Sequence, residues 1–81
     1  MPPKTHIRRL TLREREALEV LVTLGAGLAD DFTNEELRTA FRALARRYHP
    51  DRHPNASEPQ RMQLGLLFGH AYAAYKLLSH V

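Results

Sequence analysis

The sequence contains no cysteine. It therefore has no disulfide, no thiolate nucleophile and no thiolate-bound zinc, which suits a reducing compartment. It also has no long apolar run, and no such run follows the start Met1-Pro2-Pro3-Lys4, so we expect neither a signal peptide nor a transmembrane helix. With 81 residues there is room for one small domain, and we expect it to be cytoplasmic.

Alternating strand patterns, internal repeats and low-complexity stretches are absent as well, which leaves helices. Three places carry a hydroxyl residue followed three positions later by Glu or Gln, the pattern of a helix N-terminal capping box. These are Thr11 with Glu14, Thr33 with Glu36, and Ser57 with Gln60. We expect a loose arm over residues 1–10 and one domain over residues 11–81, with helices that begin at these caps.

Each predicted helix has one apolar face at helical spacing. In the first helix, which should stop at Gly25, the face is Ala17, Leu18, Leu21 and Leu24. In the second it is Leu37, Ala40, Phe41, Leu44 and Tyr48. In the third, expected over about 58–79, it is Leu64, Leu67, Phe68, Ala71, Ala74, Tyr75 and Leu78. We expect the second and third helices to pair antiparallel, with the first lying across them.

The second helix has no acidic residue between Leu37 and Tyr48. It carries four arginines, and a fifth follows shortly after: Arg38, Arg42, Arg46, Arg47 and Arg52. Arginines on a helix often form only a solvated face. Here they lead into a turn, and the whole chain has a net charge of +3, which favours an acidic partner such as a protein surface, nucleic acid or anionic lipid.

Residues 48–52, Tyr-His-Pro-Asp-Arg, form the turn after this helix. Proline disfavours the helical conformation in the residue before it, so His49 should lie in the turn and not on the helix. The carboxylate of Asp51 should either bond to nearby backbone or point to solvent.

The sequence gives little support for a catalytic or metal-binding site in this turn. His49 and Asp51 flank a proline, and no nucleophile or phosphate-binding loop accompanies them, so we expect no enzyme activity. His49 and His53 lack helical geometry because of the prolines beside them, and no third ligand is evident, so we expect no metal and no cofactor. The aromatic residues Phe41, Tyr48, Tyr72 and Tyr75 stand beside leucines at helical spacing and are better interpreted as core than as stacking residues for nucleic acid.

Residues 37–53, LRTAFRALARRYHPDRH, resemble the second helix and signature loop of J domains, the domains that define the DnaJ family of co-chaperones. The third helix is similar to the pattern FxxAxxAYxxLS of that family. Its matching residues are Phe68, Ala71, Ala74, Tyr75, Leu78 and Ser79, with Ala71-Tyr72 as an alternative register for the Ala-Tyr pair. The first helix departs from the family pattern, since Val20-Leu21 replaces the usual tyrosines.

This resemblance implies an all-α J-domain bundle with the signature loop between the two paired helices. It also implies docking on a DnaK-type, seventy-kilodalton heat-shock chaperone and stimulation of its ATP hydrolysis. The activating tripeptide would be His49, Pro50 and Asp51, and electrostatic docking would use Arg38, Arg42, Arg46, Arg47 and Arg52. Client proteins would bind a region outside this sequence. The alternative is a basic helical module without chaperone activity that binds nucleic acid, with Arg8 and Arg9 as additional contacts, or that binds another acidic protein surface.

Overall fold

The structure is a computed structural model that describes residues 9–80. The described part is all-helical, as predicted, and contains no strand. In chain order its elements are α1 (Leu12–Leu24), α2 (Asn34–Tyr48), the single-turn 3₁₀ helix η1 (Pro50–Arg52) and α3 (Glu58–Leu78).

All three predicted capping boxes are present at the starts of the helices. At α1 the Thr11 hydroxyl accepts a hydrogen bond from the Glu14 N–H at 3.2 Å, and the Glu14 carboxylate accepts one from the Thr11 N–H at 2.8 Å. Both bonds satisfy backbone donors that the first helical turn leaves unpaired. The same pair of reciprocal hydrogen bonds caps the other two helices. Thr33 and Glu36 form it at α2, and Ser57 and Gln60 form it at α3.

The helix ends are also set by local sequence. Gly25 caps α1 with φ of 121°, a backbone conformation that residues other than glycine rarely adopt. The Gly25 N–H donates to the Val22 carbonyl at 3.0 Å, and the Ala26 N–H donates to the Leu21 carbonyl at 2.9 Å. These two bonds form a Schellman motif, which closes the helix and starts the loop to α2.

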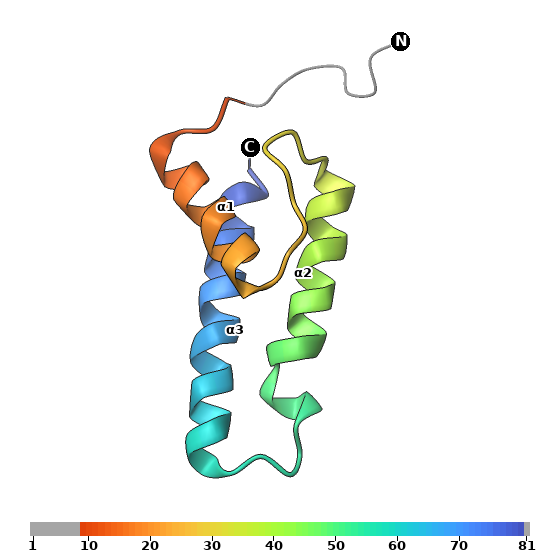
Figure 1. The fold of residues 1–81 in the computed structure, drawn as a ribbon, viewed down its shortest axis with the longest axis vertical. Helices are drawn as coiled ribbons and strands as arrows, with labels where there is room; N and C mark the ends of the chain where they lie inside the picture. The colour runs from red at the N-terminus through yellow and green to blue at the C-terminus, as the bar shows by residue number, and fades with distance from the viewer. Residues whose placement is uncertain (1–8, 81) are drawn as a thin grey trace.

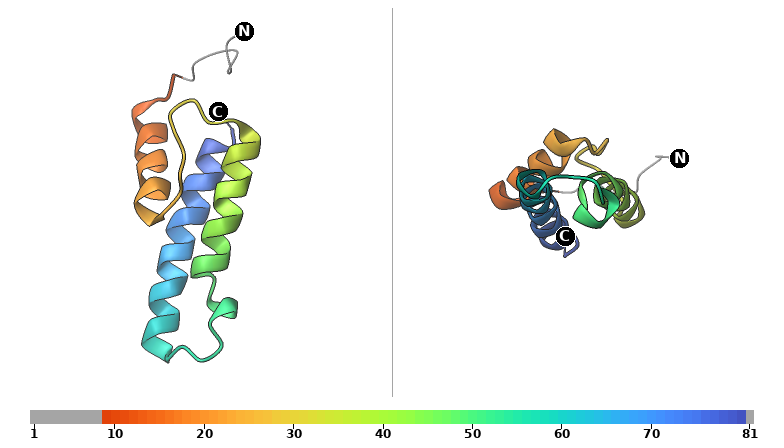
Figure 2. Two further views of the ribbon diagram at one scale, coloured as in Figure 1. Left: turned by 45° about the vertical axis from the view of Figure 1, so that its right-hand side comes forward. Right: turned by 90° about the horizontal axis from the view of Figure 1, so that it is seen from below.

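The helices are arranged as a hairpin with a third helix on its side (Figure 1). Helices α2 and α3 run antiparallel and contact one another, and α1 packs along the C-terminal half of α3. The loop between α1 and α2 runs back along the hairpin toward the start of α2, as both side views show (Figure 2). The end of the hairpin that carries η1 extends past α1, so it stands apart from the three-helix part of the fold.

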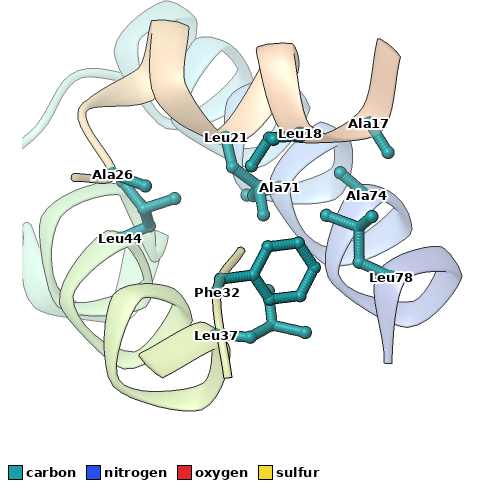
Figure 3. Packing of buried hydrophobic residues seen from close by; sticks show 10 residues of the cluster. All are labelled: Ala17, Leu18, Leu21, Ala26, Phe32, Leu37, Leu44, Ala71, Ala74 and Leu78. Atoms are coloured by element: carbon teal, nitrogen blue, oxygen red, sulfur yellow. The ribbon is translucent and has the colours of Figure 1, made fainter. Parts of the chain in front are cut away.

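Among residues 9–80, ten buried apolar residues form the core (Figure 3). Eight come from the predicted helix faces: Ala17, Leu18, Leu21, Leu37, Leu44, Ala71, Ala74 and Leu78. The other two come from the α1–α2 loop. Ala26 is 8% exposed, and Phe32 is 1% exposed and lies at the centre of the cluster. Helical periodicity identifies only residues on helices, so these two residues lie outside the predicted core.

The predicted N-terminal arm falls mainly on residues 1–8, which lie outside the described residues. Leu10, at the end of the predicted arm, is half-buried and packs against the core. Within the described range, none of the helices combines the length and the apolar character needed to cross a membrane.

Candidate functional site

The turn at the end of the hairpin, residues 49–53, is called the tip below. His49 is the C-terminal cap of α2, directly after Tyr48. Its ψ of 128° is that of extended backbone, so His49 lies in the turn and not on the helix, as predicted. Pro50 then opens η1, which is closed by bonds from the Arg52 N–H to the His49 carbonyl and from the His53 N–H to the Pro50 carbonyl, each 3.0 Å. The proline thus ends one helix and begins a rigid single turn.

The His49 ring is held from two sides. Its Nδ1 atom accepts a hydrogen bond from the Asp51 N–H at 3.2 Å, as in the cap of a helix. The edge of the ring meets Phe68 of α3, with 4.8 Å between ring centroids and 66° between ring planes. Phe68 belongs to the predicted inward face of α3, but its contact with His49 was not predicted. Both contacts limit the rotation of the imidazole.

The Asp51 carboxylate points to solvent, which is one of the two alternatives that the sequence left open. Its side chain is 83% exposed, and its Oδ2 atom lies 3.9 Å from Nδ1 of His49. Nδ1 already accepts the Asp51 N–H, so the carboxylate does not form the hydrogen bond that an acid–base relay would need. The arrangement presents a carboxylate on a rigid turn.

His53 has a different hydrogen-bond partner from His49. Its Nε2 atom donates a hydrogen bond to the Arg47 carbonyl at 2.8 Å, and this bond ties the end of the tip to the last turn of α2. The two imidazoles therefore serve separate contacts. Among residues 9–80, no group of three potential metal ligands comes together.

Three of the five predicted docking arginines share one face of α2. Arg38, Arg42 and Arg46 recur every four residues, are exposed, and are called the arginine stripe below. No ion pair joins them to an acidic side chain in the described part of the chain. Their charge is therefore available to a partner. Arg52 of η1 is exposed as well, at the tip.

Arg47 is exposed but faces another direction. Successive residues of a helix are turned by about 100°, so Arg47 leaves the line of the arginine stripe. Its guanidinium lies over the Tyr48 ring, 5.6 Å from the centroid, and its Nη1 atom is 3.0 Å from the position that a Cβ on Gly25 would take. Arg47 therefore covers the end of α1.

The aromatic residues pack along the seam between α2 and α3, and at its tip end against the end of α1. Phe41 stacks on Tyr75 with 4.5 Å between centroids, and the Tyr48 hydroxyl donates to the Leu24 carbonyl at 2.8 Å. Phe41, Tyr48 and Tyr75 are half-buried against the core, as predicted. The same prediction is wrong for Tyr72, which is 47% exposed. Tyr72 lies at the rim of the seam, where its ring contacts Phe68 and Phe41 with centroid distances of 6.4 Å and 6.1 Å.

A sequence model of the DnaJ domain family matches residues 26–80, which leaves out α1. Chaperone protein DnaJ of Bordetella bronchiseptica is 36% identical over 67 residues, which are 83% of this chain and 15% of that protein. Chaperone protein DnaJ of Burkholderia mallei is 34% identical over 68 residues, 84% of this chain and 15% of that protein. The chain thus spans a small part of the length of these curated relatives. No solved structure matches it.

Proposed function

Because the chain belongs to the DnaJ domain family, we propose that it acts as a J-domain co-chaperone, which docks on a DnaK-type chaperone and stimulates its ATP hydrolysis. The activating tripeptide is His49, Pro50 and Asp51. The docking arginines are Arg38, Arg42, Arg46, Arg47 and Arg52. The domain is not itself an enzyme and acts in the cytoplasm.

The observation that carries the proposal is the rigid, exposed tip. The backbone bonds of η1 and the two contacts of the His49 ring hold the tip in one conformation. A partner that binds it loses little conformational freedom on the domain's side of the interface. The Asp51 carboxylate is presented to solvent, where a basic group of the partner can pair with it.

The arginines supply the attraction for the chaperone. Arginine forms two parallel hydrogen bonds with a carboxylate, so the arginine stripe suits an acidic protein surface. Exposed charges accelerate association, but each contributes little to the final affinity. Docking should therefore be fast and salt-sensitive, with the tip providing the specific contact.

Stimulation then follows from a difference in affinity. If the tip and the arginine stripe bind the hydrolysis-competent conformation of the chaperone better than its resting conformation, docking shifts the population toward hydrolysis. The domain needs no catalytic group of its own for this effect, because the chaperone carries out the chemistry.

Single-turnover ATP hydrolysis by a DnaK-type chaperone tests the proposal. The intact chain should accelerate hydrolysis, and His49→Gln or Asp51→Asn should return the rate to the unstimulated value. His49→Gln replaces the imidazole that the Asp51 N–H and Phe68 hold in place, and Asp51→Asn removes the exposed charge without changing the size of the side chain. Helical content measured by circular dichroism should not change.

Glu19→Gln, the same neutralisation at an exposed position of α1, is the matched control and should stimulate as the intact chain does. If the intact chain gave no acceleration, or if both tip variants kept it, the co-chaperone proposal would fail. The rival class makes a different prediction: salt-dependent DNA binding that is lost with Arg42→Ala and Arg46→Ala but indifferent to Asp51→Asn.

A further inference from the structure

An open cleft lies beside the tip, where the chain returns to α3. It is lined by Arg52 and His53 of the tip, by residues 54–56, and by side chains from the first two turns of α3. The right-hand view of Figure 2 looks at this end of the hairpin from below. Its volume is about 580 Å³, within the range of pockets that bind ligands.

The walls of the cleft are fixed by hydrogen bonds. His53 is tied to the Arg47 carbonyl by its ring, and the Ala56 N–H donates to the His53 carbonyl at 3.0 Å. At the start of α3, the Ser57 N–H donates to the Gln60 side-chain oxygen at 2.8 Å. The return segment is therefore anchored at both of its ends, and the cleft is part of the folded structure.

The cleft combines apolar side chains with amide groups. Leu64 and Ala56, both half-buried, are apolar residues of its lining. The side-chain amides of Asn55 and Gln63 make no hydrogen bond within the described residues. A primary amide both donates and accepts, so it matches the N–H and C=O groups that an extended peptide presents along its length. The chemistry of the cleft thus fits a peptide segment.

The residues that line the cleft carry charge of one sign. No acidic side chain is found among the described lining residues, while Arg52 is one of them. Arg52 also belongs to the proposed docking arginines. A segment bound in the cleft would therefore lie next to the chaperone surface that binds the tip. The favoured occupant is an extended segment with a carboxylate side chain that can pair with Arg52.

We propose that the cleft formed by Arg52, His53, Asn55, Ala56, Gln63 and Leu64 binds an extended acidic segment of the DnaK-type chaperone. This inference rests on the proposed function, since it assigns a second contact to the same partner. The tip would determine activation, and the cleft would add affinity and select among chaperones that differ in this segment.

The absence of cysteine allows a direct test by labelling. In the full chain, a single cysteine at Gln63 labelled with an environment-sensitive fluorophore should change its emission when an ATP-loaded DnaK-type chaperone is added. Leu66→Cys is the matched control, because Leu66 is 62% exposed on the same helix but does not line the cleft. Its emission should stay unchanged or change much less.

Filling the cleft gives an independent measurement. Gln63→Trp should raise the concentration for half-maximal ATPase stimulation about tenfold, with the maximal rate kept, while Leu66→Trp should have no such effect. With stimulation by the intact chain established, an unchanged half-maximal concentration for Gln63→Trp together with a silent label at residue 63 would overturn the cleft assignment alone. A label that responded equally to an unfolded client protein without the chaperone would also overturn it, in favour of a client site.

Discussion

Gly25 links backbone conformation to stability at the scale of a single residue. With φ of 121°, a side chain at this position would be strained, and its Cβ would meet the Arg47 guanidinium at 3.0 Å. We expect Gly25→Ala to lower the free energy of unfolding by about 1 to 2 kcal/mol, measured by urea denaturation. Gly27→Ala is the control, since nothing lies within 4 Å of its Cβ position and its φ is not positive. Equal effects of the two variants would contradict this account.

Tyr48 contributes a second contact between the tip end of α2 and α1. Its hydroxyl donates to the Leu24 carbonyl at 2.8 Å, at the end of α1, where helix carbonyls lack partners. Tyr48→Phe should cost about 1 kcal/mol of unfolding free energy, because it removes one partly buried hydrogen bond. Tyr72→Phe provides the comparison, as the Tyr72 hydroxyl makes no hydrogen bond within the described residues. The prediction fails if both variants are equally stable.

At the scale of the element, the arginine stripe of α2 should act as one charged surface. Removing Arg42 and Arg46 together should weaken binding to the chaperone roughly tenfold at low salt, since each exposed pair contributes up to about 1 kcal/mol. The difference from the intact chain should shrink as salt is raised, because salt screens exposed charges. Fluorescence anisotropy over a salt series measures both effects.

Arg61→Ala tests whether position matters more than total charge. Arg61 is an exposed arginine of α3 outside the stripe, and its loss changes the net charge of the chain by one. We expect the Arg61→Ala variant to bind the chaperone with an affinity and a salt dependence close to those of the intact chain. A loss with Arg61→Ala as large as with Arg42→Ala would mean that net charge, and not the face of α2, attracts the partner.

At the scale of the whole molecule, Phe32 joins the loop to all three helices through the core. It is 1% exposed and lies among residues of α1, α2 and α3 (Figure 3). Phe32→Ala should lower the free energy of unfolding by about 3 to 5 kcal/mol. This is a large part of the roughly 5 to 15 kcal/mol that stabilises a typical domain. Loss of cooperative thermal unfolding, followed by circular dichroism, is the expected result.

A milder substitution keeps this prediction measurable if Phe32→Ala does not fold. Phe32→Leu retains an apolar side chain and should leave a folded domain of reduced stability. Leu12→Ala, at a leucine that is 74% exposed, should change the unfolding midpoint little. If Phe32→Ala were no more destabilising than Leu12→Ala, the loop would not be part of the core.

The sequence by itself determined the features that depend on near neighbours. Capping boxes and the Gly25 stop act over a few residues, so the helix starts and the end of α1 were predictable. Pro50 excluded His49 from α2 for the same reason. The periodic apolar faces then identified eight of the ten core residues, because helical spacing decides which side chains share a face.

Only the tertiary structure decided what depends on contacts between distant parts of the chain. Phe32 is central although it lies in a loop, Tyr72 is exposed although its spacing resembles that of core residues, and Arg47 covers Gly25. At the site, the sequence located the tip, but the contact of His49 with Phe68 and the cleft beside Arg52 exist only once α3 has packed back against α2. Local rules determine where elements begin and end, whereas packing between elements determines which surfaces remain free for a partner.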